Sequence, residues 1–124
     1  MKRLILGIAS AATLMACATV PSAAAGPTAG LGQTASVAGL HIRPLRVVED
    51  SRCPINARCV WAGRVIVTAE VSRGGARANY NLTIGEPIPY GGGQLTLVAA
   101  EPGRVAGQDT ARRAYRFTFA FEPR

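Results

Sequence analysis

Alternation of apolar and polar residues with a period of two is the dominant pattern of this chain from about residue 33 onward. In the run 64–72, valine and alanine occupy every second position, and the run 77–84 places Ala78, Tyr80, Leu82 and Ile84 in the same way. Because successive side chains of a strand point to opposite faces, each run predicts a strand with one buried face. Gly74 and Gly75 lie between the runs and predict a tight hairpin.

Three further strands are predicted at about 40–48, 94–100 and 114–122. The last has an aromatic stripe on one face, which we interpret as core rather than as a ligand platform: Tyr115, Phe117, Phe119 and Phe121. Pro44 lies inside the first of these strands and predicts either an edge strand or a bulge there. Segments 86–93 and 102–112 are rich in glycine and proline and are predicted to be loops.

No segment after residue 33 has the periodicity of an amphipathic helix, so the predicted fold class is all-β. Five or six antiparallel strands in one domain, residues 33–124, are typical of a small β-sandwich or a partly open barrel. The pattern alone does not distinguish these two architectures.

The chain begins with Met1-Lys2-Arg3 and an apolar run at 4–14, followed by Leu14-Met15-Ala16-Cys17. The run is too short for a membrane-spanning helix and has the length of a secretory signal. This start resembles a bacterial lipoprotein signal, which implies a signal peptide at 1–16 and lipidation of Cys17. Residues 17–32 are then a flexible tether rich in small residues.

Two locations remain open for the mature protein. Lipidation implies a membrane as partner, and Ala18 after the cysteine, by resemblance to the best-known sorting rule, favours the periplasmic face of the outer membrane. The alternative is cleavage of an ordinary signal after Ala25, where small residues form an A-x-A site. In that case the protein is free in the periplasm or secreted.

The chain has three cysteines, Cys17, Cys53 and Cys59. Lipidation of the first leaves two that we expect to pair in an oxidising compartment, which would stabilise the fold by about 2 kcal/mol. A zinc site is not expected, because zinc takes four ligands and His41 is the only histidine. No cofactor is predicted.

The most distinctive motif surrounds these two cysteines. Asp50-Ser51-Arg52-Cys53-Pro54 is followed by Cys59-Val60-Trp61-Ala62-Gly63. The combination resembles a signature of small exported bacterial proteins, which are often lipoproteins and are mostly described as hypothetical proteins. The resemblance implies an exported β-domain and assigns no activity to any residue.

Every residue type in this segment except Arg58 has a structural interpretation. We expect a disulfide-closed corner in which Pro54 restricts the backbone, Trp61 covers one end of the core and Gly63 permits close approach of two segments. Asp50 can pair with Arg52 or with loop amides, and Ser51 can bond to nearby backbone. Arg58 has no structural assignment.

Removal of Lys2 and Arg3 with the signal peptide lowers the formal net charge from +7 to +5, and every remaining basic residue is arginine. The main hypothesis is a non-catalytic envelope lipoprotein with a binding or structural role. One alternative is a protease-inhibitor-like loop that presents Arg58 or Arg52 to a protein partner. Another is binding of anionic envelope glycans by the dispersed arginines. Nucleic acid is excluded as a partner by location.

An enzyme is not predicted. The sequence has no nucleophile elbow, phosphate-binding loop or metal-ligand cluster. Glu49 and Asp50 are neighbours on a strand, so their side chains point to opposite faces and make a poor acid/base pair.

Overall fold

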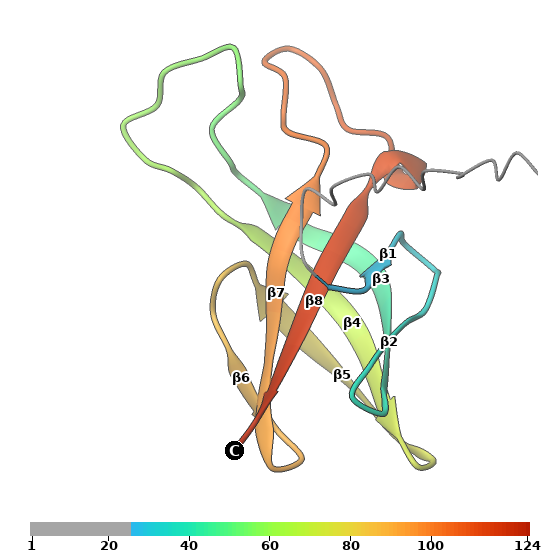
Figure 1. Cartoon of the computed structure of the whole chain (residues 1–124). Helices are drawn as coiled ribbons and strands as arrows, with labels where there is room; N and C mark the ends of the chain where they lie inside the picture. Colours follow the sequence, from blue (N-terminus) through green and yellow to red (C-terminus); the bar gives the residue numbers. More distant parts are fainter. Residues whose placement is uncertain (1–25) are drawn as a thin grey trace, which may run out of the picture.

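The computed structural model describes residues 26–124, which form two antiparallel four-stranded sheets (Figure 1). The predicted signal peptide, Cys17 and most of the predicted tether lie outside the described residues. The first sheet has the order β1 (Thr28–Ala29), β8 (Arg116–Pro123), β7 (Gly93–Glu101) and β6 (Ile88–Tyr90). The second has the order β2 (Ala35–Val37), β3 (Leu40–Asp50), β4 (Val65–Arg73) and β5 (Ala76–Thr83). The prediction of an all-β fold is confirmed in its sandwich-like form, since the sheets do not close into a barrel.

The five strands expected from alternation are present as β3, β4, β5, β7 and β8. The β4–β5 hairpin turns at Gly74 and Gly75, which have φ values of 55° and 90°. Only glycine adopts this left-handed region without strain, so the two glycines explain the tight connection.

Three short strands were not expected, and one of them extends the domain toward the N-terminus. Thr28 and Ala29 of β1 pair with Thr118 and Phe117 of β8, and Ala29 is buried. The backbone N–H of Gly32 also donates to the carbonyl of Pro44 at 2.7 Å. The fold therefore begins near residue 28 rather than 33, because backbone pairing with β8 orders a segment that is too short to show alternation.

Strand β6 corrects the prediction of a loop at 86–93. Ile88 and Tyr90 are partly buried against the core, and Pro89 lies between them. β6 is at the edge of its sheet and pairs only with β7, so the missing N–H of proline is tolerated there.

An edge position does not explain how Pro44 is tolerated in a strand, because β3 lies between β2 and β4. The β3–β4 register shifts between Pro44 and Arg46, and Pro44 is fully buried. Of the two predicted outcomes for this proline, the bulge is confirmed and the edge strand is wrong.

The core lies between the two sheets. Its largest fully buried side chains come from β3, β4 and β5 on one side and from β7 and β8 on the other: Leu40, Ile42, Val65, Val67, Val71, Leu82, Leu95, Leu97, Phe117 and Phe119. The aromatic stripe of β8 is core as expected, with Phe121 partly exposed at its end.

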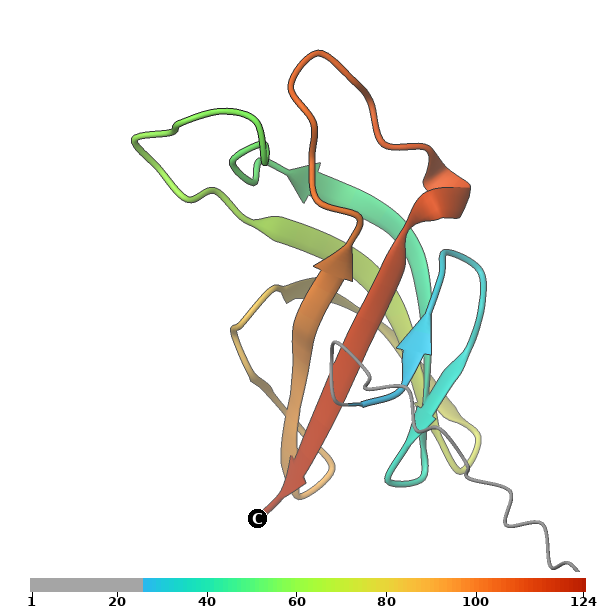
Figure 2. The same cartoon turned by 45° about the horizontal axis from the view of Figure 1, so that its top comes forward.

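Two long loops project from the same end of the domain (Figures 1 and 2). One joins β3 to β4 and holds the cysteine motif, and the other joins β7 to β8 and ends in the short 3-10 helix η1 (Arg112–Ala114). No helix within residues 26–124 is long and apolar enough to cross a membrane.

Candidate functional site

At the base of the β3–β4 loop, hydrogen bonds join residues 51–53 to residues 62–64. The N–H of Ser51 donates to the carbonyl of Arg64 at 2.8 Å, and the N–H of Arg64 donates to the Ser51 hydroxyl at 3.0 Å. The N–H of Cys53 donates to the carbonyl of Ala62 at 3.2 Å. Gly63 has a φ of 68°, and a Cβ at this position would overlap the Ser51 carbonyl. The close approach expected of Gly63 is therefore confirmed.

Within the loop tip, residues 54–61, the disulfide between Cys53 and Cys59 closes a ring that ends before Val60 and Trp61, and the two cysteine Cα atoms are 5.7 Å apart. The predicted pairing is confirmed. Within the tip, the N–H of Ala57 donates to the carbonyl of Pro54 at 3.1 Å. A turn and a covalent bridge thus restrict this short segment.

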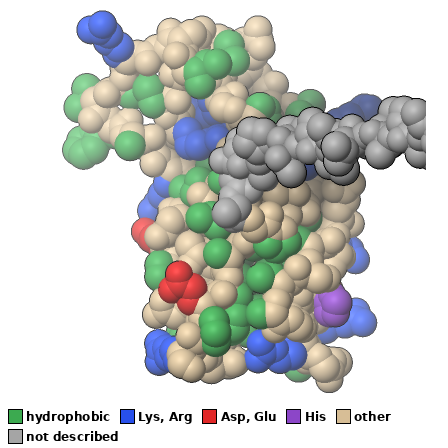
Figure 3. All heavy atoms as spheres, in the orientation of Figure 1, with side chains coloured by type: hydrophobic (Ala, Val, Ile, Leu, Met, Phe, Trp, Pro, Cys, Tyr) green, Lys and Arg blue, Asp and Glu red, His purple; other side chains and the backbone are tan. Residues whose placement is uncertain are grey.

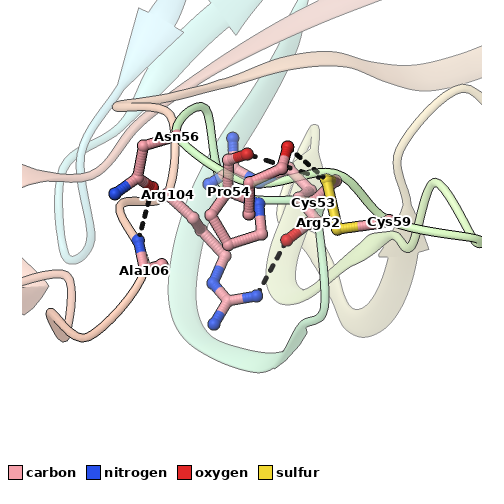
Figure 4. Close-up of a disulfide and its surroundings, with 8 residues drawn as sticks. Arg52, Cys53, Pro54, Asn56, Cys59, Arg104 and Ala106 are labelled. Carbon is pink, nitrogen blue, oxygen red and sulfur yellow. Dashed lines mark hydrogen bonds between the residues drawn. A yellow bond between two sulfur atoms is a disulfide. The ribbon is translucent and has the colours of Figure 1, made fainter.

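Besides the bond from Arg52 to Pro102 described below, three hydrogen bonds attach the loop to its neighbour between β7 and β8. Figure 4 shows the two that involve the side chains of Arg104 and Asn56. The N–H of Ile55 donates to the carbonyl of Arg104 at 2.8 Å, and the Arg104 guanidinium donates to the carbonyl of Arg52 at 2.8 Å. The N–H of Ala106 donates to the Asn56 side chain at 2.8 Å. Two loops distant in sequence therefore support each other.

Below the loops, Arg52 forms a partly buried network that joins the two sheets. Its Nε and Nη2 donate to both oxygens of Asp50, at 2.8 and 2.9 Å. Its Nη1 donates to the carbonyl of Ala100 at 2.7 Å, and Nη2 also donates to Pro102 at 3.0 Å. The Tyr115 hydroxyl donates to Asp50 Oδ2 at 2.8 Å. Asp50 is the last residue of β3 in one sheet. Ala100 belongs to β7 of the other sheet, and Tyr115 directly precedes β8 of that sheet, so the network bridges the two layers.

Ionisation of the network follows from these contacts. Burial raises the pKa of Asp50, but hydrogen bonds from Arg52 and Tyr115 and the charge of Arg52 outweigh burial, so the pKa is lowered. The pKa of Tyr115 is raised, first by burial and then by its hydrogen bond to the Asp50 carboxylate. Both groups are therefore held in their ordinary ionisation states at neutral pH.

Glu49, the sequence neighbour of Asp50, has a separate partner. Its Oε2 accepts a hydrogen bond from Arg64 Nε at 2.6 Å, and this bond lowers the pKa of Glu49. Both side chains are exposed, so solvent screens the pair. The two adjacent carboxylates are thus engaged by different arginines, as expected for neighbours on a strand.

The tip presents an apolar surface to solvent. Ile55 is 76% exposed, Val60 93% and Trp61 83%. In Figure 3, hydrophobic side chains and a basic side chain cover the loop that Figure 1 places between β3 and β4. The prediction that Trp61 covers the core is wrong. Tyr115 occupies that end of the core, stacked on Phe117 with ring centroids 5.5 Å apart.

The two arginines considered for recognition differ in their surroundings. The Arg52 side chain is 17% exposed and all its contacts are internal to the fold, so its interpretation as a recognition residue is not supported. Arg58 is exposed at the tip, and among residues 26–124 no hydrogen bond or ion pair engages its side chain. Arg58 therefore exposes its guanidinium to solvent at the tip.

Two contributors were not foreseen from sequence. Tyr115 was assigned to the aromatic stripe, and its hydroxyl could not be matched to Asp50 without knowing how the sheets pack. Arg104 lies in a predicted loop with no local signal.

His41 is exposed and within hydrogen-bonding distance of the Ser36 hydroxyl, which lies 3.0 Å from the Nδ1 atom of His41. Residues 26–124 contain no group of three or more His, Cys, Asp or Glu placed to hold a metal ion.

No protein-family model, curated protein or solved structure significantly resembles the chain.

Proposed function

We propose that the protein is a non-catalytic binding protein of the bacterial cell envelope, lipid-anchored at Cys17, and that its loop tip binds another protein. The observation that carries this proposal is the exposure of Ile55, Val60 and Trp61 on a segment fixed at its base. A flexible loop could turn these side chains inward, but both parts of the tip are restrained. Ile55 lies in the disulfide ring and is bonded to the β7–β8 loop. Val60 and Trp61 lie between the disulfide at Cys59 and the backbone hydrogen bond from Cys53 to Ala62.

The composition of the tip suits a protein interface. Tryptophan and arginine are enriched among the residues that dominate binding energy, and both occur here as Trp61 and Arg58. Full burial of a side chain such as Val60 or Ile55 contributes about 1.5–3 kcal/mol. A restrained loop also loses less conformational entropy on docking. The complementary partner has an apolar pocket with an acidic group beside it.

The experiment is site-specific photo-cross-linking in the native host, with the cross-linker at position 60. Val98 on β7 is 46% exposed and gives a matched control position. We expect a protein adduct at position 60 that is absent at position 98 and absent when Trp61→Ala is also present. With the purified partner, Trp61→Ala should weaken binding about 30-fold, as for a hot-spot residue. Adducts at both positions, or adducts with lipid only, would overturn the proposal.

The anchor is tested separately by intact mass of protein from the membrane fraction. A mass equal to residues 17–124 plus acyl chains supports lipidation of Cys17. An unacylated mass that starts at Gly26 rejects the anchor and indicates a free periplasmic or secreted protein. This result leaves the loop-tip proposal untouched.

A second candidate is inhibition of a trypsin-like protease by Arg58. It is favoured by the exposure of this side chain next to the disulfide half Cys59. Titration of trypsin should then reach full inhibition at one equivalent, and Arg58→Ala should abolish it. Cleavage after Arg58, or no inhibition, rejects this candidate.

A further inference from the structure

A hollow of about 320 Å³ lies beside η1, where the β7–β8 loop ends, and its walls combine three arginines with two leucines. We call it the arginine groove, and it is lined by Leu31, Gly32, Arg43, Leu45, Arg112 and Arg113. None of these residues belongs to the loop tip, so the groove is independent of the proposed interface.

The fold gathers these residues from three distant parts of the chain. Gly32 is held against β3 by its hydrogen bond to the Pro44 carbonyl. Arg43 and Leu45 are residues of β3 itself. Arg112 begins η1, and its Nη2 donates to the carbonyl of Leu45 at 3.5 Å, which directs this side chain toward β3. Arginines that are dispersed in the sequence therefore line one hollow.

Within residues 26–124, no ion pair engages the arginines of the groove. No acidic residue lines it, and the ion pairs within residues 26–124 involve only Arg52 and Arg64. The acid nearest in register is Glu70, which lies opposite Arg43 in the β3–β4 pairing. Glu70 lines an adjacent hollow with Arg43 and Arg77, and no atom of it approaches Arg43 as an ion pair.

We propose that the arginine groove binds a phosphate group carried by an amphiphilic molecule. Guanidinium groups bind phosphate oxygens through paired hydrogen bonds, and three of them match the charge of a phosphate monoester better than that of a single carboxylate. The side chains of Leu31 and Leu45 add an apolar wall that a free inorganic ion does not use. The ligand class is thus a phosphorylated lipid or glycolipid.

The test compares two variants of equal net charge. Arg112→Gln/Arg113→Gln removes two groove arginines, and Arg77→Gln/Arg124→Gln removes two exposed arginines outside the groove. The probes are inorganic phosphate, measured by calorimetric titration, and phosphatidylcholine vesicles with or without phosphatidic acid, measured by sedimentation. All four arginines are exposed, so melting temperatures should stay near that of the unmodified protein.

We expect the groove variant to lose at least about tenfold in affinity for the phosphatidic acid vesicles, because two charge-assisted hydrogen bonds are removed. The control should change far less. Leu45→Ser should weaken vesicle binding and leave binding of inorganic phosphate unchanged. Groove-dependent binding of inorganic phosphate with no preference for vesicles would assign the site to free phosphate.

Three results would overturn the proposal. One is equal weakening by both double variants, since that indicates general electrostatic attraction. The second is an equal affinity for acetate, titrated in the same way as inorganic phosphate. The third is no binding of inorganic phosphate or of the phosphatidic acid vesicles.

Discussion

Replacement of Arg52 by methionine should destabilise the domain much more than the same replacement of Arg64. The two arginines lie at the base of one loop and each pairs with a carboxylate, but their surroundings differ. Arg52 makes four hydrogen bonds, two of them to the Asp50 carboxylate, and the side chains of the pair are 17% and 9% exposed. The side chains of Arg64 and Glu49 are 56% and 39% exposed.

The expected magnitude follows from what Arg52→Met leaves behind. Asp50 loses its guanidinium partner and keeps, among side-chain donors, only the Tyr115 hydroxyl, and the carbonyls of Ala100 and Pro102 lose a donor. Removing one partner of a buried ion pair costs about 3–5 kcal/mol, and the remaining solvent access of this pair places the expected loss at about 3 kcal/mol. The effect of Arg64→Met should be small, because water screens an exposed pair.

Urea unfolding followed by far-ultraviolet circular dichroism measures both variants with the disulfide intact. Arg52→Met should lower the midpoint while the dependence on urea stays the same, which indicates a change in stability alone. Its melting temperature should fall by more than about 10 °C. Equal losses for the two variants would show that the Arg52 network does not join the sheets as described.

Three further predictions concern the same end of the domain. The pKa of Asp50 is lowered from 3.8, so its contribution to stability is present above about pH 4 and is lost as pH falls through the folded-state pKa; urea unfolding between pH 2 and 7 should show this loss, and Asp50→Asn should lack it. Cys53→Ser should lower the free energy of unfolding by about 2 kcal/mol, but the fluorescence emission of Trp61 should not shift, because this side chain is already exposed; a shift on mutation would contradict the exposed position. Gly63→Ala should destabilise more than Gly75→Ala: both positions have positive φ, and only at Gly63 would the new Cβ overlap backbone, so equal melting temperatures would refute the close approach.

Much of the fold could be predicted because each long strand carries its own signal. β4 and β8 alternate so regularly that burial of one face follows from the residues alone. β1 and β6 have two and three residues, and pairing with the adjacent strand defines them more than their own composition does. Elements of this kind depend on tertiary context, so no local pattern reveals them.

The candidate sites show the same division. The disulfide, the Asp50–Arg52 pair and the role of Gly63 follow from residue types at short separation, and the structure contains all three. The position of Trp61 could not be predicted in this way, because residue types do not show which aromatic side chain fills the end of the core. Tyr115 fills it because stacking on Phe117 and bonding to Asp50 satisfy both its ring and its hydroxyl. The arginine groove depends on where η1 meets β3, which a linear pattern does not specify.

The division of labour within the β3–β4 loop has a consequence for how its surface can change. The side chains that hold the loop in place belong to the base, to Asn56 and to the two cysteines. Those at positions 57, 58 and 60 face solvent, whereas the side chain of Ile55, although largely exposed, lies against Gly103 of the β7–β8 loop. Replacement of the side chains at 57, 58 and 60 therefore leaves the supporting contacts in place. Substitutions at the exposed positions can therefore change the surface of the tip while the base and the disulfide keep the loop in the same conformation.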